Sequence, residues 1–149
     1  MSREIRTEIA IRTSPERVWA VLTEFGSYRE WNPFVREISG EARVGARLTV
    51  RLQEEGGRTM TFRPRVLVWG PGRELRWLGR LGIPGLFDGE HSFALAPAEG
   101  GVTFSQTERF RGLLVPFLWK RLQRGTKPMF VRMNEALRAR AETLLPPPP

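Results

Sequence analysis

The sequence predicts an α+β fold in which a curved antiparallel sheet of about seven strands is covered by one long C-terminal helix. Three observations lead to this expectation. Apolar and polar residues alternate repeatedly between residues 3 and 110, with the period of half-buried strands. Residues 14–31 interrupt this pattern with helical spacing. From residue 115 to 145 apolar residues recur every three or four positions, as in an amphipathic helix.

The composition favours a single globular domain. The chain has 149 residues, of which 40% are hydrophobic and 27% charged, and no apolar run approaches the ~20 residues that cross a bilayer. It contains no cysteine, which excludes disulfides and thiolate metal sites. The charged start "MSREIRTEIAIR" lacks the apolar segment of a signal peptide, so we expect a cytoplasmic protein. We expect one domain over residues 1–145, followed by a proline tail at 146–149.

The first strand and the helical insertion carry separate signals. Alternation in residues 3–11, "REIRTEIAI", places one isoleucine-rich face towards the interior. Ser14 and Pro15 then supply an N-cap and a first-turn proline for a helix that Gly26 ends. A second short helix is expected to run through Trp31. Because both helices are too small to cover a sheet, we expect them to close its open end.

About six more strands are expected before residue 112. They are the edge segment "FVREISGE", then "ARLTVRLQEE", "RTMTFRPRVLVWG", "RELRWLGRL", "HSFALAP" and "VTFSQTERF". Pro64 argues for a bulge or a break in the third of these segments. Strict alternation would leave Trp69 on the outward face beside Leu67. A covering loop, a dimer contact and a bulge after Pro64 are three open explanations for that tryptophan.

The C-terminal helix is the only element large enough to cover the sheet. Pro116 suits its first turn, and Pro128 is expected to kink it by removing a backbone hydrogen bond. Its basic residues outnumber its acidic ones, and the apolar segment "GLLVPFLW" at 112–119 precedes them. The net charge of the whole chain is +8.

These elements carry a resemblance to a known superfamily. The matching segments are "SPERVW" at 14–19, "FGSY" at 25–28, "WNP" at 31–33, "GEHSFAL" at 89–95, "GVTFSQTERFRG" at 101–112 and "NEAL" at 134–137. With the order of elements, they resemble the START-like helix-grip superfamily, also called SRPBCC, and within it the small bacterial polyketide cyclase/dehydrase-like proteins. The resemblance implies a helix-grip fold with a deep apolar cavity between the sheet and the long helix. It implies no shared catalytic residues, because members include lipid carriers, cyclases, hormone receptors, ubiquinone-binding proteins and co-chaperones.

His91, the only histidine, is the strongest candidate for site chemistry. It shares an alternating face with Phe93, which marks that face as interior. Pairing Leu95 with Val102 across the last hairpin would set His91 opposite Gln106, with Glu108 one step away, whereas a slipped register would set His91 opposite Glu108. In either register the three polar groups converge in an apolar interior. A ligand anchor, a general acid/base pair and a hydrogen-bonded trio without a ligand remain open interpretations.

Other motifs favour no cofactor and no nucleic acid. In "DGEH" at 88–91, alternation directs Asp88 and Glu90 away from His91, and a single histidine without cysteines makes a metal site improbable. The glycines of "GRLGIPGLFDGE" do not form a phosphate-binding loop or a dinucleotide fingerprint. The aromatic residues face inward and so would not act as stacking platforms for bases.

The leading hypothesis is a non-enzymatic protein that binds or transports a small lipid-like or polyketide-like apolar ligand in the cavity. The candidate cavity residues are Trp31, Phe62, Trp77, Leu81, His91, Phe93, Phe104, Gln106, Glu108, Gly125, Met129 and Met133. No metal or cofactor is expected, and the protein is expected to be a monomer or a homodimer.

Two alternatives belong to other functional classes. The first is an enzyme of the polyketide cyclase or aromatase type that uses His91 and Glu108. The second is a module that docks on a membrane surface or a partner protein through the basic last helix, in which Arg121, Arg124 and Arg132 would carry the charge.

Overall fold

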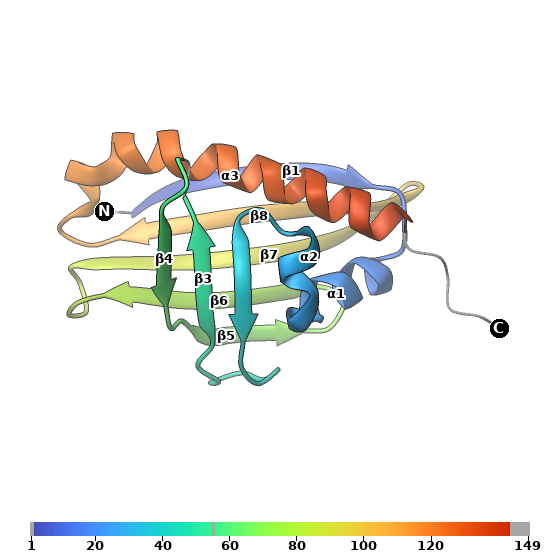
Figure 1. Ribbon diagram of the computed structural model, residues 1–149, viewed down its shortest axis with the longest axis horizontal. Coiled ribbons are helices and arrows are strands. Elements are labelled where there is room, and N and C mark those ends of the chain that lie inside the picture. The colour runs from blue at the N-terminus through green and yellow to red at the C-terminus, as the bar shows by residue number, and fades with distance from the viewer. Residues whose placement is uncertain (1, 55, 144–149) are drawn as a thin grey trace.

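A computed structural model describes residues 2–54 and 56–143 and confirms the predicted α+β class. The described chain has eight strands, rather than about seven, and a long C-terminal helix (Figure 1). The expected proline tail at 146–149 lies outside the described residues. Within the described ranges, no helix is long and apolar enough to cross a membrane.

The larger sheet has five antiparallel strands in the order β1-β8-β7-β6-β5. Their bounds are β1 (Ser2–Ile11), β5 (Arg65–Gly70), β6 (Glu74–Leu81), β7 (Phe87–Ala98) and β8 (Gly101–Arg111). Alternation holds along them, because Ile5, Leu75, Phe93 and Phe104 are all buried. This sheet forms the back wall of the molecule in Figure 1.

A smaller sheet contains β2 (Val35–Ser39), β3 (Thr49–Gln53) and β4 (Thr59–Phe62), and its strands cross those of the larger sheet in Figure 1. The chain just before β3 joins the two sheets. There the Leu48 N–H donates to the Pro64 carbonyl at 2.8 Å, and the Val66 N–H donates to the Ala46 carbonyl at 2.8 Å. These hydrogen bonds join the two sheets, so that together they surround the interior of the protein.

A β-bulge in β5 explains the orientation of Trp69. The register of β5 on β6 shifts between Val66 and Val68, so that Trp69 lies opposite the buried Leu75. The shift turns Trp69 towards the interior, where its ring packs edge-on against Trp19 at 5.4 Å. Of the three explanations left open by the sequence, the bulge holds, and helical residues cover the ring.

The helical insertion consists of α1 (Pro15–Thr23), the 3-10 helix η1 (Phe25–Ser27) and α2 (Tyr28–Trp31). As predicted, Ser14 caps α1, and its side-chain oxygen accepts a hydrogen bond from the Arg17 N–H at 3.2 Å. The Tyr28 side chain is fully buried, and its hydroxyl donates to the Leu22 carbonyl. Burial raises the pKa of Tyr28. Together these helices close one end of the sheet, on the right in Figure 1.

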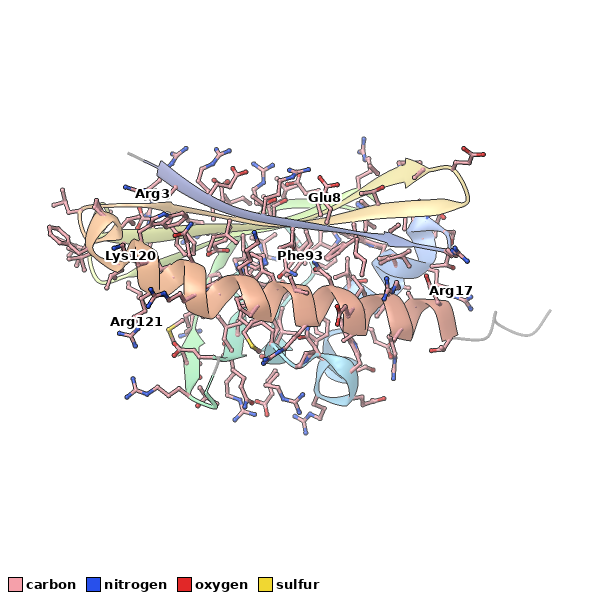
Figure 2. The ribbon with its side chains drawn as sticks, turned by 90° about the horizontal axis from the view of Figure 1, so that it is seen from above. Arg3, Glu8, Arg17, Phe93, Lys120 and Arg121 are labelled. Atoms are coloured by element: carbon pink, nitrogen blue, oxygen red, sulfur yellow. The ribbon has the colours of Figure 1, made fainter. Side chains whose placement is uncertain are left out.

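The long helix α3 (Val115–Thr143) has two halves that differ in burial. In the second half, Met133, Leu137 and Ala141 are completely buried, and this half runs beside β1 (Figure 2). In the first half no residue is fully buried between Val115 and Met129. The helix is continuous through Pro128, and the first half stands away from the sheet.

Candidate functional site

A cavity of about 1120 Å³ lies between the first half of α3 and the facing strands of both sheets. Its apolar lining comes from Phe34, Leu52, Met60, Phe62, Trp77, Leu81, Phe87, Phe110, Phe117, Leu118, Leu122 and Phe130. The deep end lies at Phe34 and Phe130, whose rings pack 5.5 Å apart. The mouth lies at Leu81 and Phe117, which are exposed to solvent.

Glycines in the lining act in two different ways. Gly79 on β6 and Gly89 on β7 are directly paired, and their missing side chains make room for other lining residues: a Cβ at Gly79 would come 3.1 Å from the Phe62 ring, and one at Gly89 would come 2.5 Å from Glu108 Oε1. On the opposite side, a Cβ at Gly125 of α3 would meet no atom within 4 Å. Gly125 therefore adds open space on the helix side of the cavity, whereas the glycines of the sheet let Phe62 and Glu108 approach the wall.

His91 lies in the wall of this cavity and is only 5% exposed. The register of β7 on β8 places it directly opposite Glu108, and its Nδ1 lies 2.6 Å from Glu108 Oε2. The slipped register is therefore the one observed. The expectation that Leu95 pairs with Val102 is wrong, because a two-residue turn between Ala98 and Gly101 shifts the pairing and sets Leu95 opposite Phe104.

A buried chain of hydrogen bonds fixes the other side of the His91 ring. The Thr7 hydroxyl donates to the Gln106 backbone carbonyl at 3.4 Å, so the Thr7 hydroxyl oxygen accepts a hydrogen bond from Asn134 Nδ2 at 2.8 Å. This leaves Asn134 Oδ1 to accept from Gln106 Nε2 at 2.8 Å, and Gln106 Oε1 to face His91 Nε2 at 3.0 Å. Because an amide oxygen can only accept, His91 must carry a proton on Nε2. This series of hydrogen bonds begins at a backbone carbonyl, which can only accept. The donor and acceptor roles of every later group in the series follow from that starting point.

Glu108 has unused capacity to accept hydrogen bonds. Its side chain is 15% exposed, and buried Oε2 makes no well-directed hydrogen bond within the described residues, although Nδ1 of His91 lies close to it. The carboxylate lies over Gly89, where an added Cβ would come 2.5 Å from Oε1. Both ring nitrogens of His91 already face polar partners. Glu108, and not His91, is therefore the group that can accept a hydrogen bond from a molecule in the cavity.

The structure brings half of the predicted cavity residues together. Phe62, Trp77, Leu81, His91, Glu108 and Gly125 line the cavity. The others lie elsewhere: Phe93, Phe104, Gln106 and Met133 are buried in the solid core, Trp31 packs on Tyr28 at 5.1 Å, and Met129 lines a separate pocket of about 390 Å³ near Pro33. These six residues do not line the cavity, and Phe93, Phe104, Gln106 and Met133 lie where the second half of α3 packs on the sheet. Their side chains face inward as predicted, but they occupy positions along their strands or helix that the cavity does not reach.

Several lining residues were missed from the sequence. Leu118 and Leu122 share one stripe of α3 with Gly125, and the helical period alone would have identified them. Phe130, five residues after Gly125, lies off that stripe. Phe34 lies just before β2 and Met60 lies in β4, and no local pattern in the sequence indicates how the smaller sheet folds over the larger one.

Asp88 and Glu90 take no part in the site. Asp88 lies 3.5 Å from Arg80 and Glu90 lies 3.5 Å from Arg76. Across residues 2–54 and 56–143, no three acidic or histidine side chains gather in a way that could hold a metal ion.

A long C-terminal helix held in a folded antiparallel sheet, with a cavity beneath its first half, defines the helix-grip class of ligand-binding folds. The chain belongs to the family described as polyketide cyclase / dehydrase and lipid transport, whose model matches residues 2–142. No curated protein matches the sequence.

Solved structures share this fold at low sequence identity. The Zhui aromatase/cyclase from Streptomyces sp. R1128 is 14% identical with a TM-score of 0.77, over 95% of this chain and 94% of that one. Protein CV1439 from Chromobacterium violaceum is 21% identical with a TM-score of 0.71, over 95% and 99%. The di-domain aromatase/cyclase StfQ from the steffimycin biosynthetic pathway is 15% identical with a TM-score of 0.77, over 95% of this chain. This chain spans about half of StfQ, since 52% of StfQ is covered.

Proposed function

We propose that this protein binds a small, mainly apolar molecule in the cavity beneath α3, with one hydrogen-bond donor of the ligand directed at Glu108. The carrying observation is a cavity of about 1120 Å³ whose mostly apolar wall contains one buried carboxylate with unused acceptor capacity. Ligand sites typically occupy roughly 300–1,000 Å³ and combine an apolar lining with a few polar groups. At about 1120 Å³ the cavity lies slightly above this volume range, and its lining meets the second criterion.

The wall offers different contacts to the two parts of such a ligand. Phe62, Trp77 and Phe130 offer aromatic surface to its apolar body. A hydroxyl or N–H group on the ligand would donate to Oε1 of Glu108, the carboxylate oxygen that does not face His91. We therefore infer a ligand with a ring or an acyl chain and one donor group.

The test is titration with anilinonaphthalene sulfonate, an apolar fluorescent probe, against the wild type and a variant with a filled cavity. Gly125→Phe directs a ring into space that is open in the wild type. We expect saturable binding to the wild type and a loss of affinity of about tenfold or more in the variant. Leu122→Trp, one turn earlier on the same stripe, provides a second filled cavity if Gly125→Phe does not fold.

Gly26→Phe is the matched control. A Cβ at Gly26 also meets no atom within 4 Å, but this glycine lies in η1, outside the cavity. Dye binding should be unchanged in this variant. Equal binding by wild type and both filled variants, with native circular dichroism throughout, would refute the proposal.

The His91–Glu108 pair supports a second candidate, a cyclase-type enzyme. The Nδ1–Oε2 contact of 2.6 Å brings a ring nitrogen and a carboxylate close enough to share a proton. Since both nitrogens of His91 face partners, Glu108 would remove or return the proton during an intramolecular aldol reaction, and His91 would position it. In this reaction a carbon between two carbonyls loses a proton and attacks a third carbonyl, and the new alkoxide takes the proton up. The resulting alcohol then loses water, and enolisation of the remaining ring carbonyls gives the aromatic product.

This second candidate is tested with a synthetic linear poly-β-ketone, by following the absorbance of the aromatic product. The wild type should accelerate ring formation over buffer, and Glu108→Gln should lose roughly a hundredfold of that rate. Glu90→Gln, on the opposite face of β7, is the control and should retain the rate. No acceleration by the wild type, or full activity of Glu108→Gln, would exclude the enzyme and leave ligand binding in place.

A further inference from the structure

Exposed apolar side chains gather at the mouth of the cavity. Ile83 is 70% exposed, Leu113 is 76% exposed and Phe117 is 85% exposed. Leu81, on the same rim, lies both in the cavity lining and in contact with solvent. Large apolar side chains that stand out of the surface to this extent, next to one another, indicate an interaction site.

The backbone holds these side chains together as one surface, which we call the apolar rim (residues 81–86 and 113–117). The Leu113 N–H donates to the Gly85 carbonyl at 3.0 Å, and the Leu114 N–H donates to the Leu86 carbonyl at 3.1 Å. Gly112 permits this approach: its φ is +129°, and a Cβ there would come 2.4 Å from the Leu86 carbonyl oxygen. In Figure 1 the loop between β6 and β7 and the start of α3 lie at the same end of the molecule, opposite α1.

Cations flank the apolar rim. Lys120, Arg121 and Arg124 lie on α3 within two turns of Phe117, all are exposed, and none forms an ion pair with a described residue. Figure 2 shows Lys120 and Arg121 at this end of the helix. Arg140, in the second half, is instead 3.2 Å from Glu30. The second half retains Arg138, which forms no ion pair with a described residue, but the unpaired cations of α3 gather mainly in its first half.

We propose that the apolar rim docks on the surface of an anionic phospholipid bilayer. Ile83, Leu113 and Phe117 would insert between headgroups, while the cations of α3 face lipid phosphates. A bilayer fits better than a protein partner because Ile83 and Leu113 project singly from loops and Phe117 projects from the first turn of α3, whereas the centre of a protein interface is closely packed. Docking would turn the cavity mouth towards the acyl chains, so that an apolar ligand could enter or leave without crossing water. That purpose rests on the proposed function, but docking itself does not require a ligand.

The experiment is co-sedimentation of the full chain with vesicles of phosphatidylcholine, with or without about a third phosphatidylglycerol. We expect binding to the anionic vesicles only. Ile83→Ser with Leu113→Ser should lower the partition coefficient by about tenfold or more, because it removes inserted apolar surface. Lys120→Glu with Arg121→Glu should lower it by at least about tenfold, because it reverses the attraction to phosphate.

Two matched variants control for general effects. Val44→Ser with Val131→Ser removes exposed apolar side chains outside the rim. Arg73→Glu with Arg138→Glu makes the same change in net charge at exposed positions away from the mouth. Both controls should bind like the wild type. The proposal is overturned if the wild type does not bind anionic vesicles, if the controls lose as much binding as the rim variants, or if Ile83→Ser with Leu113→Ser binds like the wild type. Rim-dependent association with a protein but not with vesicles overturns it too.

Dye binding in solution separates this proposal from the ligand-binding function. Ile83 and Leu113 do not line the cavity, so their double variant should keep its affinity for anilinonaphthalene sulfonate. Conversely, Gly125→Phe should still bind vesicles. Loss of vesicle binding with intact dye binding, or the reverse, would show which of the two proposals fails.

Discussion

His91 on β7 and Glu108 on β8 face each other across adjacent strands, with Nδ1 of the ring 2.6 Å from Oε2 of the carboxylate. Gln106 holds the other ring nitrogen, and Gln106 is itself held by Asn134 of α3. The pair is therefore positioned by the sheet and by the well-packed half of the helix. The cavity lies beside this rigid region, under the half of α3 that stands away from the sheet.

Gly89 provides the space in which the Glu108 carboxylate lies, so Gly89→Ala should displace it. The added methyl would start 2.5 Å from Oε1, and we expect a loss of about 1–2 kcal/mol of unfolding free energy, measured by urea denaturation. In a Glu108→Ala background the clash is absent, and the nearest remaining atoms are at ordinary contact distance. There the same substitution should be neutral or stabilising by about 0.5 kcal/mol, as expected for glycine replaced in a strand. Equal costs in both backgrounds would contradict this account.

Gln106→Leu should be strongly destabilising although the volume hardly changes. The substitution leaves His91 Nε2 and Asn134 Oδ1 buried without their partner, and each unpaired group costs about 1–3 kcal/mol. We expect a total loss of roughly 2–5 kcal/mol by chemical denaturation. Ser105→Ala, on the outward face of the same strand, should stay within about 0.5 kcal/mol of the wild type. A small effect of Gln106→Leu would mean that the hydrogen-bond chain is not intact in solution.

Gly125→Ala should stabilise the protein by about 0.5–1 kcal/mol, because alanine costs less backbone entropy in a helix and its methyl meets no atom within 4 Å. Gly101→Ala is the contrasting change. Its methyl would lie 2.1 Å from the Ile11 carbonyl oxygen, so it should lower the melting temperature. Thermal unfolding of the two variants should give shifts of opposite sign. A lower melting temperature for Gly125→Ala would show that this part of α3 is more tightly packed than described.

The stability of the protein should fall in alkali because of Tyr28, the only tyrosine. Burial raises the pKa of Tyr28 above its ordinary value of 10.0, so the folded state holds this proton more tightly than the unfolded chain. The contribution to stability is complete below pH 10 and is lost as pH rises above it. Tyrosinate absorbance should therefore appear only as the chain unfolds. Tyr28→Phe should flatten the alkaline dependence while losing about 1 kcal/mol with the hydrogen bond to Leu22. Ionisation of Tyr28 in the folded protein would disprove this.

The sequence was sufficient to predict which face of most elements is buried. The period of two placed His91, Phe93, Gln106 and Glu108 on the interior side of their strands. The helical period placed Met133 and Leu137 on the face of α3 that covers the sheet. Local signals also located the short helices, since the cap at Ser14 is formed as expected. These features depend on neighbours within a few positions, and such neighbours are visible in a single chain.

Features set by tertiary geometry were harder to predict. The glycines at 100 and 101 are compatible with more than one hairpin turn, and a change in turn length moves the partner of His91 from Gln106 to Glu108. The bulge that turns Trp69 inward leaves no distinct local pattern. Whether an inward residue meets the cavity or the core depends on where α3 leaves the sheet. For that reason Phe104 was placed in the cavity although it belongs to the core.

The pairing of β1 with β8 has a consequence during synthesis. Residues 2–11 leave the ribosome well before residues 101–111, which form the strand that pairs with them. Until residues 101–111 emerge, this isoleucine-bearing segment has no native partner and could pair with other chains. The positions that alternate with its inward side chains carry Glu4, Arg6 and Glu8, and such charges discourage edge-to-edge aggregation. Replacing these charges would thus endanger the yield of newly made protein more than the stability of the finished one.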